Sequence, residues 1–309
     1  MAVLQLLQVG AINVALHPHP QGIYEELIRF AYSRRKVSNI YGERSGIISQ
    51  LYTVSEGDKV VALEGVVSTF TLLDPALPWF NANTADDASE EDLGELQLPE
   101  HLMPNHRRCQ FYFDIASHTW IFDTVPRKGG VAPRSMLKFL QATFMEAEVV
   151  AKFGIANLTV VPDAKSVEEV VGWSRIKSLI IKAHRPNPDY DEDDLRDFEE
   201  SLDSQNADRI ELKLVAQPDN YLAPSEKTET IAAIAADNGY VEAHGQNELG
   251  QPETRSTKEK KPLTETEYFN PEVEDAWSAF RRFAETVANG IRRQRRQIRS
   301  NRALRNGNN

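Results

Sequence analysis

Residues 46–72, "GIISQLYTVSEGDKVVALEGVVSTFTL", contain the clearest structural pattern in the chain. Two runs rich in β-branched and apolar residues flank the polar triplet Glu56-Gly57-Asp58. This pattern is typical of two antiparallel strands joined by a tight turn, and it predicts strands at 46–54 and 59–72. The fold is therefore expected to contain antiparallel pairs, which a doubly wound parallel sheet does not use.

Two further hairpins are predicted along the chain. Residues 108–124, "RCQFYFDIASHTWIFDT", contain two short apolar runs that meet near Ala116-Ser117. Residues 240–258, "YVEAHGQNELGQPETRSTK", contain two such runs that meet at "NELG". Residues 209–216, "RIELKLVA", alternate apolar and polar side chains, as a half-buried strand does. Residues 79–105 are polar and acidic and predict a surface excursion.

Helical patterns lie between these strands. They cover residues 22–36, 133–150, 191–204 and 225–239, with Pro133 suited to the first turn of its helix. A last helix is predicted from Pro271, with Trp277, Phe280, Ala284, Val287 and Ile291 on one stripe. Gly290 follows most of this stripe, so we expect the helix to fray there and leave the basic end mobile.

The order of these elements indicates an α+β fold with mixed or antiparallel sheets flanked by helices. A length of 309 residues suggests two domains. We place their boundary at the break Phe153-Gly154, which gives an N-terminal α+β domain at 1–152 and a C-terminal α+β domain at 153–309. The second would end in a basic helix and tail.

Cysteine content and hydropathy bear on the compartment. Cys109 is the single cysteine, so no intrachain disulfide can form and a reducing cytoplasm is expected. No apolar run approaches the length of a membrane helix, so we expect no membrane partner. The apolar start of the chain lacks a basic region before it and is interpreted as a buried strand, not a signal peptide.

The charge of the chain is unevenly distributed. The formal net charge is −11, yet residues 281–309 contain nine arginines and one glutamate, a local charge of +8. The remaining residues therefore carry −19. An acidic body repels polyanions, while a basic end attracts phosphate or an acidic partner. We favour nucleic-acid binding by this end; docking onto a protein partner and a merely solubilising tail are the alternatives.

Other basic residues gather in short groups in the first half of the chain. Aromatic residues do not alternate with the terminal arginines, which disfavours base stacking and favours phosphate contacts on a duplex. The candidate nucleic-acid-binding residues are Arg34, Arg35, Lys36, Arg107, Arg108, Arg127, Lys128, Arg134, Lys138, Arg281, Arg282, Arg292, Arg293, Arg295, Arg296, Arg299, Arg302 and Arg305.

The chain contains only fragments of the sequence patterns that are typical of enzymes. Glu211-x-Lys213 is half of a metal-dependent nuclease pattern, but the preceding strand supplies no aspartate, so both residues are expected to face solvent without catalytic function. His17 and His19 have no third ligand at metal-binding spacing. Cys109 begins an apolar strand and is expected to be a buried structural thiol. We assign no catalytic residue, no metal site and no cofactor.

His118 and Asp123 are residue types that occur together in catalytic sites. They lie in or beside the predicted hairpin at 108–124, and no nucleophile motif accompanies them. The glycines at 129–130 belong to the short sequence "RKGG", which lacks the flanking residues of a phosphate-binding loop. Neither feature changes the interpretation of the chain as one without a recognisable active site.

The arrangement of elements resembles that of the lambda Rex A type of phage exclusion proteins. The likeness rests on "IFDTVPRKGGVAPRSMLKFL" (121–140), on "SLIIKAHRP" (178–186) followed by an acidic helix and a strand, and on a final helix near "DAWSAFRRF" (275–283) with a basic end. The chain departs from that family in its acidic insertion at 86–100 and its longer arginine tail. "GAINVALHPHP" (10–20) resembles a bacterial family of unknown function.

The resemblance implies a dimeric protein that binds duplex DNA in bacterial defence against phages. Together with the charge distribution it leads us to expect a non-enzymatic, cytoplasmic protein that binds double-stranded DNA largely without sequence preference. The alternative is an effector or toxin subunit whose arginine-rich tail docks onto RNA or onto a protein partner from a defence operon. A homodimer is a further expectation.

Overall fold

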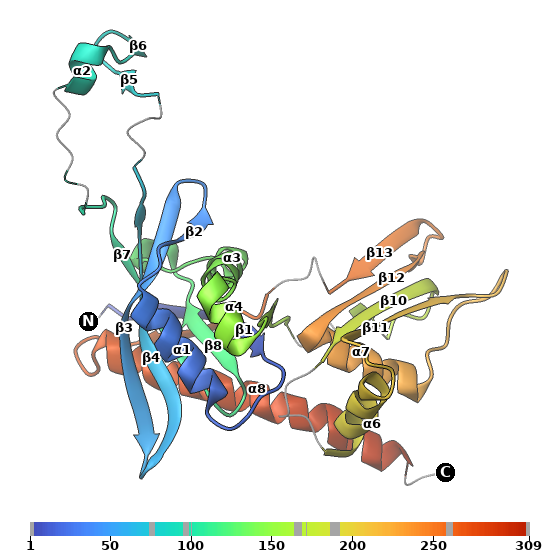
Figure 1. Cartoon of the computed structure of the whole chain (residues 1–309). Helices are drawn as coiled ribbons and strands as arrows, with labels where there is room; N and C mark the ends of the chain where they lie inside the picture. Colours follow the sequence, from blue (N-terminus) through green and yellow to red (C-terminus); the bar gives the residue numbers. More distant parts are fainter. Residues whose placement is uncertain are drawn as a thin grey trace.

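The computed structural model describes residues 3–73, 78–94, 99, 101–163, 169–170, 172–185, 192–257 and 262–306. Within these ranges, the side chains of Arg127, Asp237 and residues 192–197 and 294–306 lie outside the description. In the described residues the chain forms two main antiparallel sheets, a large one and a small one, each covered by helices (Figure 1), and a separate two-stranded ribbon. The predicted α+β class is confirmed.

The large sheet contains eight strands, all antiparallel to their neighbours. Seven follow one another in the order β14-β1-β8-β7-β4-β3-β2, and β9 pairs with the end of β1. Their bounds are β1 Gln5–Ala15, β2 Ser38–Tyr41, β3 Arg44–Glu56, β4 Lys59–Thr71, β7 Arg107–Asp114, β8 Thr119–Asp123, β9 Asn157–Val160 and β14 Glu265–Phe269.

The first predicted hairpin is strands β3 and β4. Their register runs from Glu56 opposite Lys59 to Arg44 opposite Thr71. Gly57 occupies the turn with φ 59°, a left-handed conformation that glycine adopts without the steric cost of a Cβ atom. The hairpin β7–β8 and the hairpin of β12 (Gly239–Gln246) and β13 (Pro252–Ser256) form as predicted too. Local turn chemistry and alternation were therefore sufficient to identify all three hairpins.

Helices cover both faces of the large sheet. Helices α1 (Ile23–Arg34), α3 (Pro133–Phe144) and α4 (Ala147–Phe153) contribute to one core, in which Phe113 and Trp120 are fully buried. Helix α8 (Ala276–Asn306) crosses the opposite face (Figure 1) and encloses a second apolar cluster. The sheet is therefore the middle layer of three.

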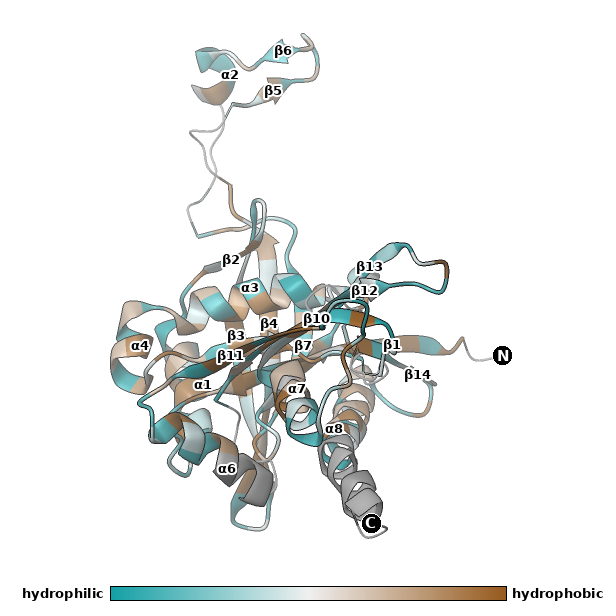
Figure 2. Cartoon of the chain, turned by 90° about the vertical axis from the view of Figure 1, so that its right-hand side faces the viewer, coloured by the Kyte–Doolittle hydropathy of each residue, from teal (hydrophilic) through white to brown (hydrophobic). Residues whose placement is uncertain are grey.

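The small sheet has its own core. Its strand order is β11 (Arg209–Val215), β10 (Ile176–His184), β12 (Gly239–Gln246) and β13 (Pro252–Ser256). Helices α6 (Glu192–Asp203) and α7 (Glu226–Asn238) pack on one face, as Figure 2 shows from the side. Leu179 and Ile181 of β10 are fully buried beneath them. The alternate positions of β10 and β11 are more exposed, as the alternation in 209–216 predicted.

The predicted boundary at residue 152 does not coincide with the division between the sheets. Phe153-Gly154 does end α4, but β9, β14 and α8, which all follow residue 152, belong to the large sheet and its cover. The chain builds the small sheet between β9 and β14 and then returns. Four- and five-residue strands carry little local signal, and their pairing with β1 is a long-range contact.

The last helix differs from its prediction at both ends. It begins at Ala276, not Pro271, because the Asp275 carboxylate accepts hydrogen bonds from the backbone amides of Trp277 and Ser278, at 2.9 and 3.1 Å. It also continues through Gly290 to Asn306 instead of fraying there. One glycine costs a helix only about 1 kcal/mol, and its Arg, Gln and Ala neighbours are good helix formers.

The acidic excursion lies on the surface, as predicted. Its described residues are 79–94, 99 and 101–105; they include β5 (Phe80–Asn81), β6 (Asp86–Asp87) and α2 (Glu90–Gly94), and none of them is buried. No helix in the described ranges combines the length and apolar character needed to cross a membrane.

Candidate nucleic-acid interface and inter-sheet pocket

Helix α8 is anchored to the large sheet along its first half. Phe280, Ala284, Val287 and Ile291 are buried, as the predicted stripe requires, and they cluster with residues of β1 and β8. Trp277 is only partly buried and contacts the Tyr52 ring edge-on, with 5.8 Å between ring centroids. In the described part of α8, Ile291 is the last buried residue.

Arg281 forms an ion pair with the buried carboxylate of Glu64. Its Nε donates to Glu64 Oε2 at 2.7 Å and its Nη2 donates to Glu64 Oε1. The Trp277 indole N–H donates to the same carboxylate at 3.2 Å. Glu64 is only 3% exposed, and these hydrogen bonds raise the pKa of Arg281 above its ordinary value. Arg281, a candidate phosphate ligand, instead neutralises a buried acid and fixes α8 to β4.

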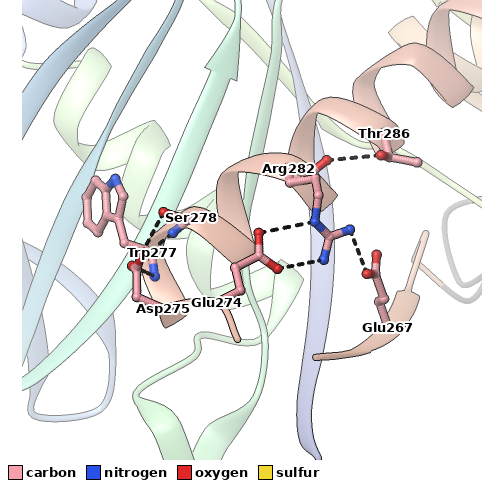
Figure 3. A network of polar contacts seen from close by, with 7 residues as sticks. All are labelled: Glu267, Glu274, Asp275, Trp277, Ser278, Arg282 and Thr286. Carbon is pink, nitrogen blue, oxygen red and sulfur yellow. Dashed lines mark hydrogen bonds and ion pairs between the residues drawn. The ribbon is translucent and has the colours of Figure 1, made fainter. Parts of the chain in front are cut away.

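Arg282 is held by two carboxylates at the start of α8 (Figure 3). Its guanidinium lies 2.7 Å from Glu267 Oε1 and donates to both carboxylate oxygens of Glu274, at 3.1 and 3.2 Å. These hydrogen bonds raise the pKa of Arg282. The side chain is about half exposed, so the network ties β14 to α8 at the molecular surface.

Arg292 lies where the helix leaves the core. Its Nη1 is 3.4 Å from Asp114 Oδ1, and its Nη2 donates to Asn289 Oδ1 at 2.8 Å. Asp114 is buried and also accepts hydrogen bonds from the Ser117 amide and hydroxyl, at 2.8 and 2.6 Å. Arg293 is exposed. The remaining candidates lie on the helical backbone with side chains outside the description: Arg295, Arg296, Arg299, Arg302 and Arg305.

The basic group at the end of α1 is partly neutralised. Arg34 lies 3.4 Å from Glu146 and 2.5 Å from Glu148, both beside or within α4. Arg35 has a left-handed backbone with φ 48° and places its guanidinium over the Tyr32 ring, 5.7 Å from the centroid. Arg34, Arg35 and Lys36 are all exposed, so the ion pairs of Arg34 lie at the molecular surface.

A second basic group surrounds the short 3-10 helix η1 (Pro126–Lys128), which contacts β7. Arg107 donates to the Pro126 carbonyl at 2.8 Å, and Lys128 donates to the Leu6 carbonyl at 3.1 Å. The structure thus brings together Arg107, Arg108, Arg127 and Lys128, although the Arg127 side chain lies outside the description. Lys138 lies on α3 and donates a hydrogen bond to Asn39 Oδ1 of β2 at 2.7 Å.

Glu211 and Lys213 face solvent, as predicted. The Glu211 carboxylate lies 2.9 Å from Arg209 Nε and 3.2 Å from Lys182 Nζ. The Arg209 and Lys182 hydrogen bonds hold the pKa of Glu211 below its ordinary value. In the described part of the chain, no group of three or more His, Cys, Asp or Glu side chains could hold a metal ion.

Cys109 is fully buried, as predicted for a structural thiol. Its Sγ donates to the Asp123 carbonyl at 3.3 Å, and burial raises the pKa of the thiol. Burial also raises the pKa of the Asp123 carboxyl to about 6, although that group accepts a 2.7 Å hydrogen bond from the Val125 amide. His118 stacks on Tyr24, with ring centroids 3.8 Å apart, at the other end of β8.

A pocket between the two sheets was not predicted. Its volume is about 270 Å³, and Lys182 and His184 of β10 face Asn157 and Thr159 of β9 across it. Asn13 of β1, Asn238 of α7 and Tyr240 of β12 complete its polar lining. One sequence signal was present, because Asn13 interrupts the apolar run at residues 9–16.

The floor of this pocket is a pair of buried amides. Asn13 Nδ2 donates to Asn238 Oδ1 at 2.9 Å, and Asn238 Nδ2 donates to the Ile234 carbonyl at 3.2 Å. The neighbouring Gly239 approaches β10 so closely that a Cβ atom would lie 1.9 Å from the Lys182 carbonyl oxygen. Only glycine fits this contact, which sets the spacing of β12 and β10 at the pocket.

A second cavity of about 350 Å³ adjoins the first and shares Leu158, Thr159 and Gly239 with it. Arg134 of α3, one of the predicted nucleic-acid-binding residues, is exposed and lines the rim of this cavity. His17 lies at the same junction of the sheets, where its Nε2 is 3.2 Å from the Arg185 carbonyl oxygen. Burial lowers the pKa of His17, and the His19 ring lies edge-on, with 5.4 Å between centroids.

None of the curated proteins matches the chain. A family model described as a domain of unknown function, DUF4747, matches residues 6–285. This range includes both sheets, the inter-sheet pocket and Arg281 and Arg282, and it ends before Arg292. Since the match covers most of its 309 residues, the chain belongs to the DUF4747 family.

Proposed function

We propose that this protein binds double-stranded DNA, largely without sequence preference, through residues 292–306 of α8, and that it does so in bacterial defence against phages. The observation that carries the proposal is the continuation of α8 for four turns beyond Ile291, its last described buried residue. This outer part contains seven arginines and no acidic residue.

The spacing of these arginines supports binding to a polyanion. Positions 292, 295, 296, 299 and 302 recur at intervals of three or four residues, so a continuous helix places them along one face. Such a row matches a line of phosphates, which arginine binds through charge-assisted hydrogen bonds. The absence of aromatic residues between them favours a duplex over a single strand.

The anchoring of the inner part supports the same proposal. The buried stripe and the Arg281–Glu64 pair hold the base of the helix on the large sheet. The basic charge is therefore concentrated in one segment of an otherwise acidic chain, whose remaining residues would repel DNA. The resemblance to phage exclusion proteins supports the defence role.

Binding of a labelled DNA duplex, followed by fluorescence anisotropy, tests the proposal. Replacing Arg295, Arg296, Arg299, Arg302 and Arg305 by glutamine should weaken binding by roughly 100-fold at physiological salt, because each lost phosphate contact lowers the electrostatic contribution. The matched control replaces Arg34, Arg35 and Lys36 by glutamine and should change affinity far less, since Arg34 is already paired.

Two results would contradict the proposal. Equal DNA affinity of the tail variant and the unmodified protein would remove the outer part of α8 as the interface. Tail-dependent binding to RNA or to a co-purifying protein, without DNA binding, would favour the alternative of an effector subunit that docks through its arginines.

A further inference from the structure

The inter-sheet pocket has the chemistry of a ligand site separate from the arginines of α8. Residues of β1 and β9 form one wall, and residues of β10, β12 and the end of α7 form the other. Its volume of about 270 Å³ is close to the lower end of ligand pockets, which begins at about 300 Å³. That size suits one small polar molecule.

Most polar groups of the pocket are neutral. Asn13, Asn157 and Asn238 contribute amides, and Thr159 and Tyr240 contribute hydroxyls. Amides and hydroxyls offer both donors and acceptors, as the edge of a nucleobase and the hydroxyls of a sugar require. The Tyr240 ring adds an aromatic surface on which a base can pack.

The pocket contains a single formal positive charge among its lining residues, that of Lys182. Lys182 Nζ shares its charge with Glu211, 3.2 Å away at the exposed side of the sheet. A ligand with two separate carboxylates would leave one of them without a cation. A polar molecule that carries a single anionic group, and whose other polar groups are uncharged, matches the lining better.

His184 has an unsatisfied polar atom at this site. Its Nδ1 is buried and has no hydrogen-bond partner among the residues that the structure describes. Burial lowers the pKa of His184, so its imidazole is neutral near pH 7 and can donate or accept a hydrogen bond. A buried polar atom without a partner is costly, and a ligand group can satisfy it.

The walls of the pocket are fixed before any ligand binds. The Asn13–Asn238 hydrogen bond joins β1 of the large sheet to the end of α7, which covers the small sheet, and the contact of Gly239 with the Lys182 backbone fixes β12 against β10. A rigid site loses little conformational entropy on binding, which favours affinity.

We propose that the inter-sheet pocket binds a nucleoside monophosphate, with the base packed on the Tyr240 ring, its polar edge against the Asn157 amide, and the phosphate beside Lys182. The adjoining cavity, where Arg134 contributes a second cation, lies next to the shared residues Leu158 and Thr159 and can receive the phosphate end. A ligand here contacts both sheets at once.

None of the residues that line this pocket belongs to α8, so ligand binding here can be measured separately from DNA binding by α8. Isothermal titration calorimetry of the full chain with the four ribonucleoside 5′-monophosphates, the matching nucleosides and inorganic phosphate tests it. We expect saturable binding of at least one monophosphate, weaker binding of its nucleoside, and a rise in melting temperature with that monophosphate.

The variants Lys182→Gln and Lys213→Gln distinguish the pocket from the surface. Both lysines lie on the same face of the small sheet, but only Lys182 lines the pocket. Lys182→Gln should weaken the monophosphate at least about 10-fold, as loss of one charge-assisted contact does, with unchanged nucleoside binding. Lys213→Gln should bind as the unmodified protein does, and both should melt at similar temperatures without ligand.

Three results would overturn the proposal: no saturable binding of any monophosphate, phosphate alone binding as tightly as the nucleotides, or equal effects of the two lysine variants. Removal of residues 292–309 should leave monophosphate binding intact. A chain that binds the monophosphate but not DNA would therefore contradict the proposed function and support this site.

Discussion

Helix α8 has two parts that meet at Ile291, and both are rich in arginine. In the inner part, Arg281 and Arg282 bind carboxylates contributed by β4, by β14 and by the turn before the helix. The outer part has no acidic residue of its own and extends beyond the last described buried side chain. The same residue type therefore stabilises the fold in one part and is available to a partner in the other.

The difference depends on residues far away in the sequence. Glu64 lies more than two hundred residues before Arg281, and Asp114 is similarly distant from Arg292. A local count of arginines cannot separate the two parts of α8. The separation appears only when the sheet brings these acids to the helix.

The largest effect is expected for Arg281→Ala. The substitution leaves Glu64 buried beside the Trp277 indole without its cation, and breaking such a pair costs roughly 3 kcal/mol of unfolding free energy. Chemical denaturation measures it. Arg293→Ala is the matched control in the same helix and should change stability by less than about 0.5 kcal/mol, because Arg293 is exposed.

Equal stability of these two variants would show that Arg281 contributes no more to the fold than a surface arginine. The double variant Glu64→Leu with Arg281→Leu separates charge from packing. It should recover most of the stability lost in Arg281→Ala, because it leaves no buried charge unpaired.

Arg292→Ala should have an intermediate effect. The substitution removes the ion pair with Asp114, but Asp114 keeps its two hydrogen bonds from Ser117. We expect a loss of about 1 kcal/mol in unfolding free energy and a modest loss of DNA affinity. Denaturation and anisotropy on the same preparation measure both. A change as large as that of Arg281→Ala would place Arg292 with the inner part of the helix.

The smallest effect is expected for Arg282→Gln. Although Arg282 contacts Glu267 and Glu274, its side chain is about half exposed, so water and salt screen both pairs. The loss of stability should stay below about 1 kcal/mol and should shrink as salt is added. A larger loss, unchanged by salt, would contradict this explanation.

Local sequence patterns predicted much of the fold. The three hairpins β3–β4, β7–β8 and β12–β13 have turn signals between alternating or apolar runs, and α1, α3, α6 and α7 have clear periodicity. The short strands β9 and β14 were missed as members of the large sheet, since nothing local indicates that both pair with β1. The domain division therefore could not be derived.

The candidate sites were less predictable than the fold. The sequence identified the basic end of the chain but could not show that Arg34, Arg281 and Arg282 are paired with acids. The inter-sheet pocket depends on Asn13 of β1 meeting Asn238 at the end of α7, a contact between residues 225 positions apart in the chain. Only the assembled fold creates such a site, although a polar residue within an apolar strand was a visible sign of it.

The proposed DNA-binding function requires that the outer arginines of α8 bind phosphates. The dependence of DNA affinity on salt concentration measures how many of them do so. If about five of them contact a duplex, log K should fall against log salt with a slope of roughly −4 to −5. For a chain lacking residues 292–309, the slope should lie close to zero and affinity should fall severely, while the folded structure persists. An unchanged slope and affinity after truncation would contradict the claim.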